Sequence, residues 1–186
     1  MKIRIKNKWN DKNKERTPED TGSVLSFNFW KIASANVMHI ENEGFQTDSH
    51  FMRLDVIAEI TAFLVHVVDR VISSKDFSAD DRKALITALA LNLAKTMHDN
   101  RQDVSGDKET DFRNDYIALM NERMSEYSNF TFEEGNQPGF QVRRCVGEHV
   151  RDVMGEKDNK WIPDQVMDIE IPDAMKAFKR VTRGVI

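Results

Sequence analysis

The stretch from residue 48 to residue 100 constrains the fold most strongly, because it contains two long apolar segments separated by a short polar break. The first segment predicts a helix that begins at Thr47 or Asp48 and continues to about Ser74. Its middle part, residues 56–72, is apolar on most sides. A helix of this kind is usually buried, so we expect it at the centre of the fold.

The second apolar segment predicts a helix that starts after Ser78 and reaches Met97 or His98. Because residues 74–77 leave only a short turn between them, the two helices are expected to form a central antiparallel hairpin. Four residues are predicted to lie in its core: Leu64, Val68, Leu89 and Leu93.

Apolar residues also recur at helical spacing in the rest of the chain, so we expect an all-α fold. Further helices are predicted at residues 23–40, around residues 112–127 and at residues 142–153, with Pro163 and Pro172 in the first turns of two short ones. The polar residues 99–110 and the Gly- and Pro-containing residues 130–141 are interpreted as loops. The chain of 186 residues is therefore predicted to form a single-domain bundle of five or six helices over residues 21–186.

The first 20 residues differ from the rest in charge and predict a basic, extended or flexible arm. Residues 1–16 contain seven basic and two acidic residues, a net charge of +5, so the remaining chain carries −9 of the total of −4. Such an arm can contact a nucleic-acid backbone or the acidic surface of the protein itself, and the two alternatives stay open.

Cysteine usage and hydropathy indicate the compartment. Cys145 is the only cysteine, so no disulfide can form within the chain. The longest apolar run, residues 56–65, contains Glu59 and Thr61 and is too short and too polar to cross a bilayer. No apolar segment typical of a secretory signal follows the basic N-terminus. A cytoplasmic protein without a membrane partner is expected.

Several histidines and carboxylates are predicted to gather at one end of the bundle. If the hairpin turn lies near residues 75–76, His98 stands at the level of Asp55. The first helix ends where the second begins, which adds further groups. The candidate ligands for Zn²⁺ or another divalent metal ion are His39, Glu41, His50, Asp55, His98 and Asp99.

The doublet His98-Asp99, at the end of an apolar helix and downstream of His66, resembles the pattern of the HD-type metal-dependent phosphohydrolases. The resemblance covers these few residues and implies metal-dependent hydrolysis. The predicted hairpin sets His66 and His98 about a dozen residues out of level, roughly 18 Å at 1.5 Å per residue. The HD pattern also needs a later aspartate, and the sequence does not single one out among Asp111, Asp115 and Asp152.

Two other groups of polar residues lie at helical spacing. Asp55 and Glu59, followed by His66 and Asp69, form a stripe on the central helix. This stripe lines a cleft, or forms the narrow solvent-facing edge of the helix, or makes a hydrogen-bonded seam with Thr87 and Asn92 of the next helix. Cys145 and His149 are one helical turn apart, the spacing of a nucleophile and its base, but the sequence gives no third group to orient them.

No motif in the chain specifies a reaction, so two functional classes are compared. The favoured one is a helical binding or scaffolding protein that associates with a protein partner or with itself through its nine methionines and its aromatic residues. The alternative is a metal-dependent hydrolase that uses the histidines and carboxylates of the central hairpin.

Overall fold

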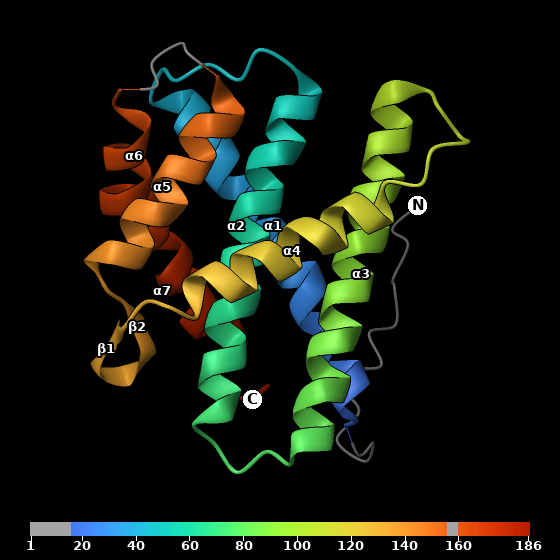
Figure 1. Ribbon diagram of the computed structural model, residues 1–186, viewed down its shortest axis with the longest axis vertical. Coiled ribbons are helices and arrows are strands. Elements are labelled where there is room, and N and C mark those ends of the chain that lie inside the picture. The colour runs from blue at the N-terminus through green and yellow to red at the C-terminus, as the bar shows by residue number, and fades with distance from the viewer. Residues whose placement is uncertain (1–15, 156–159) are drawn as a thin grey trace, which may run out of the picture.

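The fold was determined as a computed structural model that describes residues 16–155 and 160–186, and it is an all-α bundle (Figure 1). Its helices are α1 (Pro18–Asn42), α2 (His50–Ser73), α3 (Ala79–Ser105), α4 (Arg113–Tyr127), α5 (Phe140–Met154), α6 (Ile162–Gln165) and α7 (Ile171–Thr182). Two-residue strands β1 (Phe132–Glu133) and β2 (Gln137–Pro138) pair in antiparallel fashion around the 3-10 turn η2 (Glu134–Asn136). Within the described residues, six helices are at least 12 residues long, which confirms the predicted fold class.

Helix α2 lies at the centre, where α1, α3, α4 and α5 all pack against it (Figure 1). Every residue from 56 to 68 is buried, as its apolar sequence predicts. Leu64, Val68, Leu89 and Leu93 are all buried, so the four predicted core residues are confirmed. Of its buried polar side chains, Glu59 bonds to Arg123 and Thr61 to Tyr116, whereas the ring nitrogens of His66 have no hydrogen-bond partner among the described residues.

Helix α3 differs from the prediction at its surface and at its end. It buries only a stripe of residues against α1 and α2, and Leu91 on the opposite side is 59% exposed. It also continues through residues 99–105, which were interpreted as loop, and ends only at Gly106 with φ of 71°. Polar residues on a solvent-exposed turn sustain a helix through its backbone hydrogen bonds, so the loop interpretation was wrong there.

The helix starts follow local capping chemistry. The side chain of Ser78 accepts a hydrogen bond from the backbone N–H of Asp81, which confirms the predicted start of α3. Helix α2 is capped by Ser49 rather than by Thr47 or Asp48, because the Thr47 hydroxyl bonds to Glu41 instead. Pro18 opens α1 behind the cap Thr17, so residues 18–20 belong to this helix, and residues 1–15 of the predicted arm lie outside the described residues.

The C-terminal part packs α5, α6 and α7 beside α1 and α2. Pro163 and Pro172 lie in the first turns of α6 and α7, as predicted. A π-helical turn, η3 (Val166–Glu170), joins these two helices without a break. In the described part of the chain, no helix combines the length and hydropathy needed to cross a membrane.

Candidate metal centre

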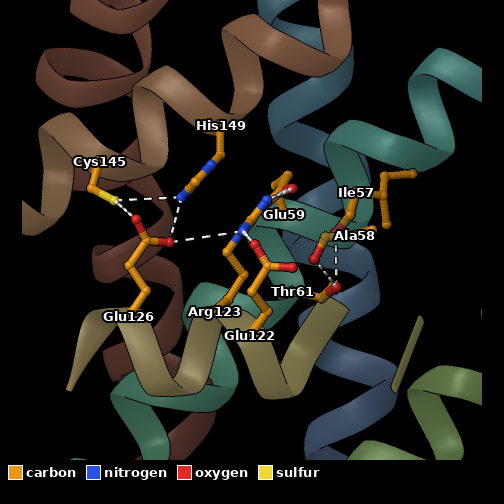
Figure 2. A network of polar contacts seen from close by, with 9 residues as sticks. All are labelled: Ile57, Ala58, Glu59, Thr61, Glu122, Arg123, Glu126, Cys145 and His149. Carbon is orange, nitrogen blue, oxygen red and sulfur yellow. Dashed lines mark hydrogen bonds and ion pairs between the residues drawn. The ribbon is translucent and has the colours of Figure 1, made fainter. Parts of the chain in front are cut away.

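A polar cluster lies where α4 and α5 meet over the central helix α2 (Figure 2). Cys145 and His149 are one turn apart on α5, so both side chains leave the same face of that helix. Glu126, in the last turn of α4, points toward both of them. The three residues bring a sulfur, a nitrogen and a carboxylate oxygen within 4.8 Å of one another.

The contacts within the cluster are short. The Cys145 thiol donates to Oε1 of Glu126 across 3.2 Å, and Nε2 of His149 lies 2.7 Å from Oε2 of the same carboxylate. Cys145 Sγ and His149 Nε2 are 3.5 Å apart. One carboxylate therefore supplies the third, orienting group that the sequence did not reveal for this pair.

Two of the separations between these ligand atoms can be compared with those of a tetrahedral metal site. With zinc–sulfur and zinc–nitrogen bonds of about 2.3 and 2.0 Å, tetrahedral angles put the sulfur and nitrogen about 3.5 Å apart. The distance between Cys145 Sγ and His149 Nε2 has this value. The oxygen of Glu126 would have to move away from Nε2 by only about 0.6 Å to reach the corresponding separation.

The charged residues around the cluster carry a net negative charge. Arg123 pairs with Glu59 at 2.7 Å and with Glu122 at 2.7 Å, and it lies 3.8 Å from Glu126. One guanidinium thus faces three carboxylates, which leaves two negative charges when His149 is neutral. A divalent cation would compensate this excess.

The protonation states distinguish metal binding from nucleophilic catalysis. Burial, and then the hydrogen bond to Glu126, raises the pKa of Cys145 to about 12, so its side chain is a thiol at neutral pH. Burial alone would raise the pKa of Glu126, but hydrogen bonds from Cys145 and His149 outweigh it and lower this pKa. A Cys–His nucleophile needs a stabilised thiolate, and this site disfavours one unless a cation replaces the proton.

Aromatic rings line the inner side of the cluster. The ring of Tyr127 lies 6.3 Å from that of His149 and 5.7 Å from that of His66. Tyr127 is buried, and neither its hydroxyl nor the ring nitrogens of His66 have a hydrogen-bond partner among the described residues. This wall excludes water from one side of the cluster, while Glu126 keeps the other side half-exposed.

The six metal ligands predicted from sequence occupy separate contacts. His39 bonds to Glu170, Glu41 bonds to Arg53, and His50 contacts the same arginine. Asp55 pairs with Arg101, His98 accepts from the backbone N–H of Phe112, and Asp99 pairs with Lys95. Among the described residues, only Glu126, Cys145 and His149 form a group of three potential ligands at metal-binding distances.

The HD-like doublet is likewise divided. His98 faces Asp111 at 3.6 Å, whereas Asp99 points to solvent beside Lys95. His66 is buried between Tyr127 and Phe132. These contacts give the doublet and His66 different neighbours.

The polar stripe on α2 is mostly a seam of ion pairs. Asp55 pairs with Arg101, Glu59 with Arg123, and Asp69 with Arg82 at 2.6 Å. Asp55 and Glu59 also line a pocket of about 210 Å³ beside α4. Asp55 and Glu59 therefore belong both to the seam and to the pocket lining, and the partners in the seam are arginines rather than Thr87 and Asn92.

Glu126 is the residue that sequence reasoning missed. It precedes Tyr127, the last residue of the apolar stripe of α4, and nothing in its spacing marks it as a partner of α5. The pair Cys145 and His149 at helical i, i+4 spacing is the signal that the sequence does contain.

Three comparisons with known proteins found no match. No family model fits the chain, no curated protein is significantly similar to it, and no solved structure resembles it significantly.

Proposed function

We propose that this protein is a helical metal-binding protein that holds one divalent transition-metal ion, of the Zn²⁺ class, between α4 and α5. The ligands are Cys145 Sγ, His149 Nε2 and a carboxylate oxygen of Glu126. The observation that carries the proposal is their convergence within 4.8 Å, from two helices, beside an excess of negative charge. Thiolate, imidazole and carboxylate are the ligand types that zinc takes in proteins.

Metal binding at this site is coupled to proton release. A zinc-bound thiol is deprotonated, and the Cys145 proton is held at neutral pH by burial and by Glu126. The affinity should therefore rise by about tenfold per pH unit for this proton alone. The lost hydrogen bonds between Glu126 and its two partners are replaced by bonds to the ion.

Three protein ligands leave a fourth position in a tetrahedral ion. Glu126 is on the half-exposed side of the cluster, so this position would face solvent and accept water or a group from a partner. The ion would also tie α4 to α5, both of which pack on α2. This role belongs to the binding and scaffolding class that the sequence favours, and a cytoplasmic location is part of the proposal.

Titration of the purified, full-length protein with Co²⁺ and Zn²⁺ tests the proposal. We expect one ion per chain, an absorption band typical of Co²⁺–thiolate bonding, and displacement of Co²⁺ by Zn²⁺. Cys145→Ser and Glu126→Gln should each weaken binding by about 10-fold or more. Cys145→Ser should also remove the thiolate band.

His98→Gln is the matched control, because it removes a histidine of α3 from the set of six ligands that the sequence predicted. Loss of the bound ion in His98→Gln with full binding in Cys145→Ser would overturn the proposal in favour of that set. A wild-type protein that takes up no Co²⁺ at pH 8 would overturn both.

A further inference from the structure

A second cavity, far from Cys145 in the sequence and built from other residues, lies between α1 and α7. Its volume is about 380 Å³, within the range of small-molecule sites. Its lining includes apolar side chains from both helices, namely Ile32, Ala174, Ala177 and Val181. The cavity can therefore hold a small aliphatic or aromatic body.

The polar lining of the cavity is centred on Glu170, a carboxylate that is 1% exposed. Glu170 is the last residue of the π-helical turn η3, a local structure that is frequent at functional sites. Its carboxylate receives Asn36 Nδ2 at 2.9 Å, His39 Nδ1 at 2.7 Å and Gln165 Nε2 at 2.9 Å. These three donors satisfy the hydrogen-bonding needs of a carboxylate that is removed from water.

At Glu170 and Asn36, the hydrogen-bonding capacity that is left is for accepting. The two hydrogens of the Asn36 amide nitrogen are directed to the backbone oxygen and to Oε2 of Glu170, at 3.3 and 2.9 Å. The carbonyl oxygen Oδ1 of Asn36 is buried and has no partner among the described residues. Since Oε2 of Glu170 receives a single side-chain donor there, a molecule that fits this lining must bring N–H or O–H groups.

We propose that this cavity binds a small primary amine, with its ammonium group at Glu170 and Asn36 and its hydrocarbon body against Ile32, Ala174, Ala177 and Val181. An ammonium has three donors and no acceptor, so it matches the two acceptors in the lining. It also brings the positive charge that a buried carboxylate favours. Lys31, another cation in the lining, lies over the ring of Phe27 at 5.6 Å.

His39 stands at the edge of the cavity and competes with the amine for the same carboxylate. The charged groups that face His39 are Glu43 at the C-cap of α1, Glu170 from η3 and Asp173 from α7, with Lys31 also in the cavity lining. The hydrogen bond to Glu170 is the main cause that raises the pKa of His39 above its usual value of 6.5. Amine affinity should therefore increase as the pH rises and His39 loses its proton.

The test is an NMR titration of the ¹⁵N-labelled full-length protein with n-pentylammonium, 1-pentanol and pentanoate as probes. We expect the ammonium to bind most tightly and to shift the amide signals of α1 and α7. Glu170→Gln should weaken its binding by about tenfold or more, because the charge is lost while the shape is kept. Between pH 6 and pH 8 the affinity of the wild type should increase, and that of His39→Gln should stay constant.

Ala177→Leu, which fills the cavity without touching the carboxylate, provides a second variant, and Ala118→Leu on the exposed face of α4 is its control. Binding should be lost in the first and retained in the second. The proposal would be overturned if 1-pentanol bound as tightly as n-pentylammonium, or if pentanoate bound most tightly of the three. It would also be overturned if Ala177→Leu and Ala118→Leu bound n-pentylammonium equally well. Should Glu170→Gln fail to fold, the comparison of probes and the alanine pair still decide.

Discussion

Arg123 donates two hydrogen bonds to Glu59, from Nε to Oε2 across 2.7 Å and from Nη2 to Oε1 across 2.9 Å. The glutamate is 1% exposed on the central helix, and the arginine reaches it from α4 (Figure 2). This fork directs the guanidinium toward Glu59 while its Nη1 stays 3.8 Å from Glu126. The pair therefore joins α2 to α4 and sets the charge beside the candidate metal centre.

Removing one member of this pair should be far more harmful than removing both. Arg123→Met leaves the Glu59 carboxylate buried without its cation, and we expect the free energy of unfolding to fall by about 3–5 kcal/mol. The double variant Glu59→Leu/Arg123→Met removes both charges and should recover most of that loss. Chemical denaturation of the wild type, both single variants and the double variant measures the coupling. Additive losses would contradict this expectation.

The buried ring of His66 should make the protein sensitive to mild acid. Burial, and then the charge of Arg70, lowers the pKa of His66 from 6.5 to about 4. Below pH 6.5 the unfolded chain takes up a proton that the folded chain accepts only near pH 4, so the free energy of unfolding falls over this interval. The loss from this residue should be about 2 kcal/mol at pH 5 relative to pH 7.5.

His66→Phe keeps a ring against Tyr127 and Phe132 and should remove this part of the acid sensitivity. The measurement is the free energy of unfolding at both pH values, compared with that of His50→Gln, which changes an exposed histidine. An equal loss between pH 7.5 and pH 5 in wild type and His66→Phe would show that other groups cause it.

Gly22 is required by the close approach of α1 to α3. A Cβ atom at this position would lie 2.6 Å from the backbone oxygen of Leu85 and 2.9 Å from the nitrogen of Leu89. Although alanine favours a helix by about 1 kcal/mol over glycine, overpacking against backbone atoms should outweigh this gain. Gly22→Ala should lower the thermal midpoint, whereas Ser23→Ala on the exposed side should leave it nearly unchanged. A more stable Gly22→Ala protein would mean that α1 and α3 can separate.

Two leucines on the central hairpin provide a test of the core. Leu64 is fully buried and Leu91 is 59% exposed. Leu64→Ala should cost about 2–5 kcal/mol of unfolding free energy, and Leu91→Ala should change it by less than about 0.5 kcal/mol. Equilibrium denaturation of both variants makes the comparison. A large loss in Leu91→Ala would indicate that this residue is covered in solution by another copy of the chain or by a partner.

The sequence predicted the fold where burial determines the pattern. Residues 56–68 are apolar because they are enclosed, so the central helix was recognised from composition alone. The end of α3 was not recognised, because none of residues 99–105 is buried and Val104 is the one apolar residue among them. The left-handed conformation of Gly106 ends that helix. A glycine five residues earlier or later in the sequence would have been an equally acceptable end of the helix.

The candidate site was only partly predictable for a different reason. Spacing along one helix put Cys145 beside His149, but Glu126 comes from a helix whose crossing angle over α2 no periodicity gives. The hairpin prediction placed Asp55 at the level of His98, and in the structure Asp55 pairs with Arg101, three residues beyond His98 on α3. The arginines were left out of that prediction, and they hold carboxylates such as Asp55 and Glu41 in ion pairs.

The π turn at Val166–Glu170 fixes the rotational phase of the C-terminal helix. A π turn holds one residue more than the α-helical turn it replaces, and each residue corresponds to about 100° of rotation around the axis. With that extra residue in place, the ring of Phe178 on α7 lies 5.7 Å from the ring of Phe29 on α1. Deletion of a single residue from this turn would therefore rotate the whole apolar stripe of α7 away from its partner helix, although no side chain of the stripe had changed.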